Sequence, residues 1–152
     1  MIGVRIGSLL TCAAGTLLLV GCSQPHPTLG ELKLTPGADT SYPGATIYSQ
    51  SPVDSAARIG SSQPASITTE ACATADPDSV LSYFGQQLQS KGWRPDTAQS
   101  PVIQGKFTAG AGWVRDGRRF DLHIDSVERA TVIAQQARAT NTCPIAYQTL
   151  LQ

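Results

Sequence analysis

Asp121, His123 and Asp125 form the only arrangement in the sequence that could support hydrolytic chemistry. Side chains that alternate along a strand face the same way, so these three would share one surface. A catalytic triad also needs a nucleophile that is hydrogen-bonded to the base, and no turn in the sequence supplies a serine for that role. We therefore interpret the three side chains as solvated residues on an open sheet face. We predict that the chain is not an enzyme and carries no cofactor.

Arg115, Arg118 and Arg119 form a second candidate site, because they flank the dipeptide Asp116-Gly117. Arginines at such a tip could contact phosphate head groups or an anionic wall polymer. Asp116 lies among them and weakens their positive field. The alternative is that these charges only keep the tip soluble.

The first 21 residues resemble a bacterial signal peptide. One basic residue, Arg5, precedes an uncharged run over residues 6–20. This run is shorter and less apolar than the roughly 20 residues that a membrane-spanning helix needs. It ends in four residues that resemble the lipobox of bacterial lipoprotein precursors, namely Leu19, Val20, Gly21 and Cys22. The alternatives are an ordinary signal peptide with a chance cysteine, or an uncleaved anchor.

The lipobox resemblance implies cleavage before Cys22 and a diacylglyceryl group on the Cys22 sulfur. Two or three acyl chains would give a durable anchor, since each buried methylene contributes about 0.8 kcal/mol. The resemblance thus places the chain in the cell envelope, held to the extracytoplasmic side of a membrane through Cys22.

The remaining cysteines become informative once this anchor is assigned. Cys12 would leave with the signal peptide, and Cys22 would carry lipid, so Cys72 and Cys143 are left. In an oxidising compartment, two such cysteines in a small domain indicate a disulfide. The alternative is a pair of free or metal-binding thiols. No CxxC spacing is present and His123 is the only histidine outside the expected tether, so we expect no metal.

Length and composition indicate one small folded unit. We expect a signal peptide over residues 1–21, a flexible tether over 22–41 and a single domain over 42–152, because the tether region is rich in proline and glycine. The chain has 11 basic and 11 acidic residues, so nothing suggests a nucleic-acid partner.

A helix over residues 77–91 is the strongest local prediction. Asp76 is suited to be its N-cap and Pro77 its first residue. Gly92 and Trp93 match a Schellman ending, in which the glycine takes a left-handed conformation. The apolar residues of one face follow helical spacing: Val80, Leu81, Phe84 and Leu88.

A hairpin is the second prediction, with Asp116-Gly117 as a two-residue type I′ turn between strands over 107–115 and 118–125. This register places three pairs on the core face, namely Trp113 with Phe120, Ala111 with Leu122, and Ala109 with Ile124. The opposite face is polar, so we expect it to meet solvent.

The predicted fold is α+β, with a mostly antiparallel sheet of four or five strands and one main helix packed on one face. Further strands are expected over 45–48, 65–72 and 131–136, and a short C-terminal helix over 144–151. The order of Tyr42-Pro43-Gly44-Ala45, the helix ending in Gly92-Trp93 and the hairpin resembles small bacterial envelope proteins. That resemblance implies a fold and no active site.

The leading hypothesis is therefore a non-enzymatic envelope lipoprotein that presents an interaction module, with an envelope protein or anionic polymer as partner. The first alternative is a carrier or chaperone for an apolar ligand, which would need a cavity over Ala109 and Ala111. The second is an envelope hydrolase that uses His123.

Overall fold

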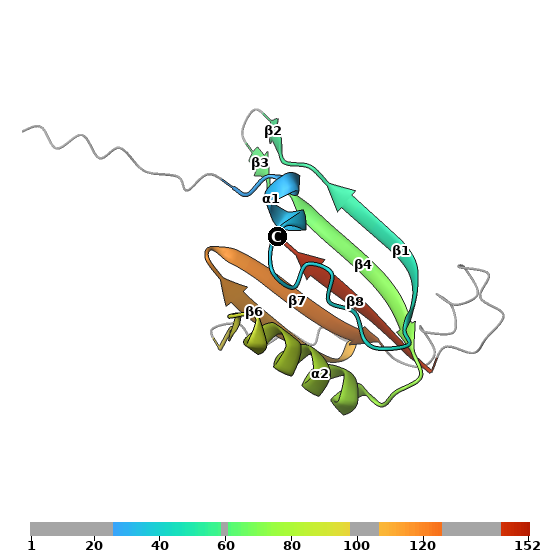
Figure 1. The fold of residues 1–152 in the computed structure, drawn as a ribbon. Coiled ribbons are helices and arrows are strands. Elements are labelled where there is room, and N and C mark those ends of the chain that lie inside the picture. The colour runs from blue at the N-terminus through green and yellow to red at the C-terminus, as the bar shows by residue number, and fades with distance from the viewer. Residues whose placement is uncertain (1–25, 59–60, 98–106, 126–143) are drawn as a thin grey trace, which may run out of the picture.

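The computed structural model describes residues 26–58, 61–97, 107–125 and 144–152, and within them an antiparallel sheet of six strands dominates (Figure 1). In spatial order the strands are β1 (Thr46–Val53), β4 (Ser66–Ala73), β8 (Ile145–Leu151), β7 (Arg118–Asp125), β6 (Phe107–Arg115) and β5 (Arg94–Pro95). A separate small hairpin pairs β2 (Ala56–Arg58) with β3 (Ser61–Gln63), and the helices are α1 (Leu29–Lys33) and α2 (Pro77–Ser90). The fold is α+β as predicted, with six strands in the sheet instead of four or five.

Helix α2 has the ends that its sequence predicts. The Asp76 carboxylate accepts a hydrogen bond from the Ser79 backbone N–H at 2.9 Å. At the other end, Gly92 has a φ of +85° and its N–H donates to the Gln89 carbonyl at 3.0 Å. The Trp93 N–H donates to the Leu88 carbonyl, also at 3.0 Å. These two bonds form the Schellman motif, which satisfies carbonyls that the helix end would otherwise leave unpaired.

The β6–β7 hairpin also has the predicted register. Its turn residues Asp116 and Gly117 have φ values of 48° and 74°, as a type I′ turn requires. The three predicted pairs, Trp113–Phe120, Ala111–Leu122 and Ala109–Ile124, lie directly opposite one another and contribute to the core. The local turn thus determines which face of both strands is buried.

Aromatic side chains join α2 to this face of the sheet. The Phe84 ring of α2 lies 6.0 Å from the Phe120 ring and 5.4 Å from the Tyr147 ring, measured between centroids. Phe120 also contacts Trp93 and Trp113 at centroid distances of 6.0 and 6.3 Å. Each such buried side chain contributes about 1.5–3 kcal/mol, so the cluster is a main source of stability.

The predicted C-terminal helix is wrong, because Ile145–Leu151 forms strand β8 in the interior of the sheet. It pairs with β4 on one side and with β7 on the other. The helical interpretation rested on Ile145, Tyr147 and Leu150. The alternation of Ile145, Tyr147, Thr149 and Leu151, all buried, is the pattern that the two neighbouring strands select.

The predicted flexible tether over 22–41 is wrong from residue 28 onward. Thr28 and Glu31 form a capping box at the start of α1, and Leu32 is fully buried in the core. Farther along, the Trp93 indole N–H donates to the Pro36 carbonyl at 2.7 Å. The folded part therefore begins before residue 42, because these contacts offset the low helix propensity of a segment rich in proline and glycine.

Several predictions concern residues outside the described ranges. These are the signal peptide over 1–21, the lipidation site Cys22, the strand over 131–136 and the second disulfide cysteine Cys143. They stay predictions. Within the described ranges, no helix is long and apolar enough to cross a membrane.

Replacing Gly92 by Ala should lower the free energy of unfolding by about 1–2 kcal/mol, because an L-residue resists the left-handed conformation. A Cβ at this position would meet its nearest neighbour, the Arg115 guanidinium, at 3.6 Å, so the cost would be conformational. Urea unfolding monitored by tryptophan fluorescence measures it.

Gly85→Ala is the matched control. A Cβ there would lie 3.9 Å from Trp113, an ordinary contact, so the change should stabilise α2 by about 1 kcal/mol. A Gly92→Ala variant as stable as the native chain would contradict the assignment of the helix end.

Tyr147 should make stability depend on alkaline pH. Burial raises the pKa of Tyr147 above its ordinary value of 10.0, although its hydrogen bond from the Tyr42 N–H, 3.0 Å long, opposes this. The pKa of Tyr147 is therefore higher in the folded than in the unfolded state. The resulting contribution to the free energy of unfolding is fully present below pH 10 and is lost as the pH rises through the folded pKa.

The measurement is urea unfolding of the native chain and Tyr147→Phe between pH 7 and 11. The variant should be about 1 kcal/mol less stable at pH 7, because the Tyr42 N–H loses its acceptor, and should lose less stability above pH 10. Identical pH profiles would contradict the assignment.

Candidate functional site

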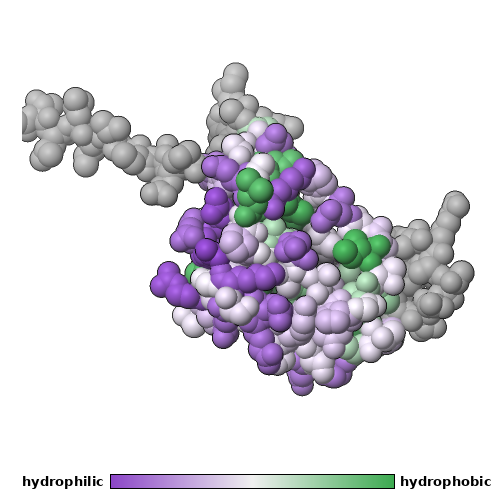
Figure 2. Space-filling view, viewed as in Figure 1, coloured by the Kyte–Doolittle hydropathy of each residue, from purple (hydrophilic) through white to green (hydrophobic). Residues whose placement is uncertain are grey.

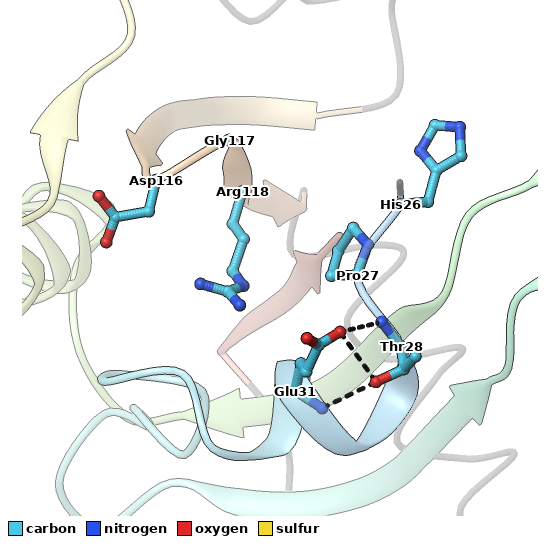
Figure 3. Close-up of a pocket in the computed structure, with 7 residues that line it drawn as sticks. All are labelled: His26, Pro27, Thr28, Glu31, Asp116, Gly117 and Arg118. Atoms are coloured by element: carbon cyan, nitrogen blue, oxygen red, sulfur yellow. Dashed lines mark hydrogen bonds between the residues drawn. The ribbon is translucent and has the colours of Figure 1, made fainter. Parts of the chain in front are cut away.

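A charged cleft lies between the start of the described N-terminal segment and the turn of the β6–β7 hairpin (Figure 3). Its volume is about 640 Å³, within the range typical of small-molecule sites. Two segments far apart in the sequence line it, namely His26, Pro27, Thr28 and Glu31 on one wall and Asp116, Gly117 and Arg118 on the other.

The Glu31 carboxylate is held in place by the capping box of α1. Its Oε2 accepts hydrogen bonds from the Thr28 backbone N–H at 2.7 Å and from the Thr28 hydroxyl at 2.9 Å. The hydrogen bond from the Thr28 backbone is the largest cause of the lowered pKa of Glu31, followed by that from the hydroxyl, with a smaller effect of the Arg118 charge. Glu31 is therefore a fixed negative charge at neutral pH.

Arg118 reaches into the cleft from the first position of β7. In Figure 3 its guanidinium points toward the wall that carries Glu31. The Nε atom is buried, and no hydrogen-bond partner for it is found in the described part of the chain. Arg118 forms none of the four ion pairs found there, so the two opposite charges face each other without contact.

The structure separates Arg118 from the two other arginines of the predicted anion site. Arg115 donates to the Lys91 carbonyl at the end of α2, and its Nε lies 3.2 Å from Asp116 Oδ2. Arg119, the next residue after Arg118, points to the opposite face of the strand, as successive residues do. Arg115 and Arg119 therefore have partners within the protein.

Arg119 is clamped between two carboxylates. It forms an ion pair with Asp96, and its Nη2 and Nε each lie 2.7 Å from an oxygen of Asp121. These contacts raise the pKa of Arg119, with the hydrogen bond to Asp121 as the largest cause. Because Arg119 compensates its charge, the Asp121 carboxylate can be buried.

The expectation of a solvated polar face is therefore wrong for this part of the sheet. Asp121 and Asp125 are only 8% and 4% exposed. Both Asp121 oxygens contact Arg119, so the Asp121 carboxylate is engaged in this ion pair.

Cys72 lies on β4, directly opposite Ala146 of β8. Its predicted partner Cys143 lies outside the described residues, so the disulfide stays a prediction. No group of three or more histidine, cysteine, aspartate or glutamate side chains within the described ranges could hold a metal ion.

Two further hollows do not provide the apolar cavity that a carrier would need. One is lined by Lys33, Ala38, Asp39, Gln50, Pro52 and Ile67, and the other by Asp78, Ser79, Ser82, Tyr83 and Gln86. Neither hollow, nor the charged cleft, is lined by Ala109 or Ala111.

Exposed apolar side chains are scattered over the surface. The largest described ones are Leu34 after α1, which is 85% exposed, and Ile47 and Val53 on β1. On the face shown in Figure 2, the apolar patches are small and polar side chains separate them. This face therefore offers no continuous apolar surface for docking.

Sequence reasoning missed the wall of the cleft formed by residues 26–31, because it assigned them to a tether. The signal was present as Thr28-x-x-Glu31 before Leu32, the spacing of a capping box at a helix start. The prolines and glycines around this capping box favoured the interpretation as a tether.

The fold and the site together define a small α+β domain with a charged cleft next to its N-terminal end. Comparison of the chain with protein-family models, with curated proteins and with solved structures finds no match.

Proposed function

We propose that this protein is a lipid-anchored lipoprotein of the bacterial cell envelope, on the extracytoplasmic side, and that its domain is a non-enzymatic binding module. The observation that carries the proposal is the lipobox-like sequence ending at Cys22, which stands only four residues before a segment that lines a charged cleft. The anchor and the cleft are thus close neighbours.

The short spacing limits how far the cleft could lie from the membrane. An extended chain spans at most about 3.6 Å per residue, so the Cα atoms of Cys22 and His26 would be separated by no more than about 14 Å. With Cys22 acylated, the hairpin turn and the start of α1 would lie close to the lipid head groups. This favours a module that acts at the membrane surface.

Binding is better supported than catalysis by the chemistry of the cleft. Its walls carry one arginine and two carboxylates, which can recognise charged groups. His123 is the candidate base of the hydrolase alternative, and it does not line the cleft. We therefore retain the non-enzymatic role and propose neither hydrolysis nor transport of an apolar ligand.

A disulfide between Cys72 and Cys143 belongs to the same proposal. Cys143 stands three residues before Ala146, the residue that lies opposite Cys72 in the sheet. Three residues span at most about 11 Å, so the chain connectivity keeps Cys143 within about 11 Å of Ala146. The bond would fasten the N-terminal end of the interior strand β8 to β4.

Peptide mass mapping of the protein purified under non-reducing conditions should find Cys72 joined to Cys143. Reduction should then yield two alkylatable thiols and lower the free energy of unfolding by about 2–4 kcal/mol. Two free thiols before reduction would contradict the pairing.

Cys22→Ala should abolish labelling with radioactive palmitate in bacterial cells and should leave the precursor unprocessed at its expected cleavage site. Cys12→Ala is the matched control, because it removes a cysteine of the same leader without touching the lipobox, and it should keep full labelling. Gel autoradiography measures both. Labelling that persists in Cys22→Ala would place the lipid elsewhere and refute the anchor.

A further inference from the structure

We propose that the cleft between Glu31 and Arg118 binds the phosphoethanolamine head group of a membrane lipid, with the phosphate at Arg118 and the ammonium at Glu31. The choice of a membrane lipid as the source of this ligand rests on the proposed lipid anchor at Cys22. The chemistry of recognition rests on the cleft alone.

The cleft contains a pair of opposite charges that do not contact each other. Glu31 and Arg118 lie on opposite walls, and Arg118 influences the pKa of Glu31 without forming an ion pair with it. Charges that face each other across a gap can be satisfied by a ligand that carries both complementary charges. Phosphoethanolamine is such a zwitterion, with its phosphate and ammonium separated by two carbons.

Arg118 has a hydrogen-bond donor that no described group of the protein satisfies. Buried polar atoms are nearly always hydrogen-bonded, so a buried Nε–H without a partner in the described part of the chain calls for an acceptor. A guanidinium can donate two parallel hydrogen bonds to a phosphate. The Nε atom itself has no accessible surface, so a phosphate in the cleft would bind the other two nitrogens of the guanidinium.

The Glu31 carboxylate can still accept further hydrogen bonds. Both hydrogen bonds from Thr28 go to Oε2, so Oε1 is left to accept from a ligand. An ammonium group has N–H donors for it, and the capping box already fixes the carboxylate in position.

The balance of charge distinguishes a zwitterion from a simple anion. Asp116 also lines the wall that carries Arg118, and its charge is compensated by the ion pair with Arg115. Glu31 and Arg118 contribute one charge of each sign, so the Glu31 carboxylate would repel a bare phosphate bound at Arg118. A ligand that brings its own ammonium does not suffer this repulsion.

The position of the cleft selects a membrane lipid over a soluble zwitterion. His26 lines the cleft and stands four residues after the proposed acylated Cys22. Lipid head groups would therefore be present at high local concentration beside the opening, whereas a soluble ligand must be captured from dilute solution.

The experiment titrates the natively processed protein, purified in detergent, with glycerophosphoethanolamine, and follows the Arg118 Nε–H resonance by NMR. Saturable binding is expected. Glycerophosphocholine has the same phosphate, but its quaternary ammonium has no N–H donor, so it should bind at least about tenfold more weakly. Inorganic phosphate should also bind more weakly than glycerophosphoethanolamine. Equal affinity for all three probes would overturn the proposal.

Three variants connect binding to the cleft. Arg118→Gln and Glu31→Gln should each weaken binding of glycerophosphoethanolamine about tenfold or more. Glutamine at position 31 can still form a capping box, so Glu31→Gln should keep α1 folded. Arg94→Gln is the matched control, since Arg94 is exposed on β5 and does not line the cleft, and its affinity should be unchanged. Unchanged affinity in both cleft variants would refute the site.

A second measurement separates this proposal from the proposed anchor. The protein is placed in nanodiscs that contain phosphatidylethanolamine or phosphatidylcholine, and the Arg118 resonance should shift only with the former. A protein that carries lipid on Cys22 and gives no shift would refute the head-group site while the anchor stands. A protein without lipid that binds the soluble probe would refute the membrane source and the anchor together, and would leave the zwitterion chemistry of the cleft.

Discussion

Trp93 joins the three parts of the molecule that must fit together. Its backbone N–H ends α2 by donating to Leu88, its ring packs against Phe120 of the sheet, and its indole N–H donates to Pro36. One residue therefore fixes a helix end, a sheet face and a loop that is distant in the sequence. Because Pro36 closely follows α1, this residue also helps to determine where one wall of the charged cleft lies. The site depends on core packing as much as on its own charges.

Three arginines that are close in the sequence have different surroundings in the fold. Arg115 contacts the end of α2, and Arg119 lies on the opposite face between two carboxylates. Arg118 opens into the cleft beside α1. The tight turn and the alternation of side chains along a strand cause this separation. Composition alone would suggest one basic tip, whereas the geometry leaves Arg118 as the cation that a ligand in this cleft can reach.

The sequence was sufficient where the deciding contacts are local. A cap at Asp76, a left-handed Gly92 and the Asp116-Gly117 turn each act within a few residues, so α2 and the hairpin were predicted with their ends and register. Ile145–Leu151 was assigned to a helix because its strand conformation depends on β4 and β7, which are far away in the sequence. The cleft could not be predicted for the same reason, since its two walls meet only after the core has formed. The sequence identifies Arg115, Arg118 and Arg119 as candidates. Only the tertiary structure shows that the three side chains have different surroundings.

The position of β8 in the middle of the sheet affects the order in which the protein can fold. β8 follows every other strand of the sheet in the sequence, yet both β4 and β7 need it to complete their hydrogen bonding. Synthesis proceeds from the N-terminus, so the two halves of the sheet cannot join until β8 has left the ribosome. Until then β4 and β7 each have one edge without its hydrogen-bonding partner strand. Such a delay would postpone the compact state until the last strand of the sheet has been made.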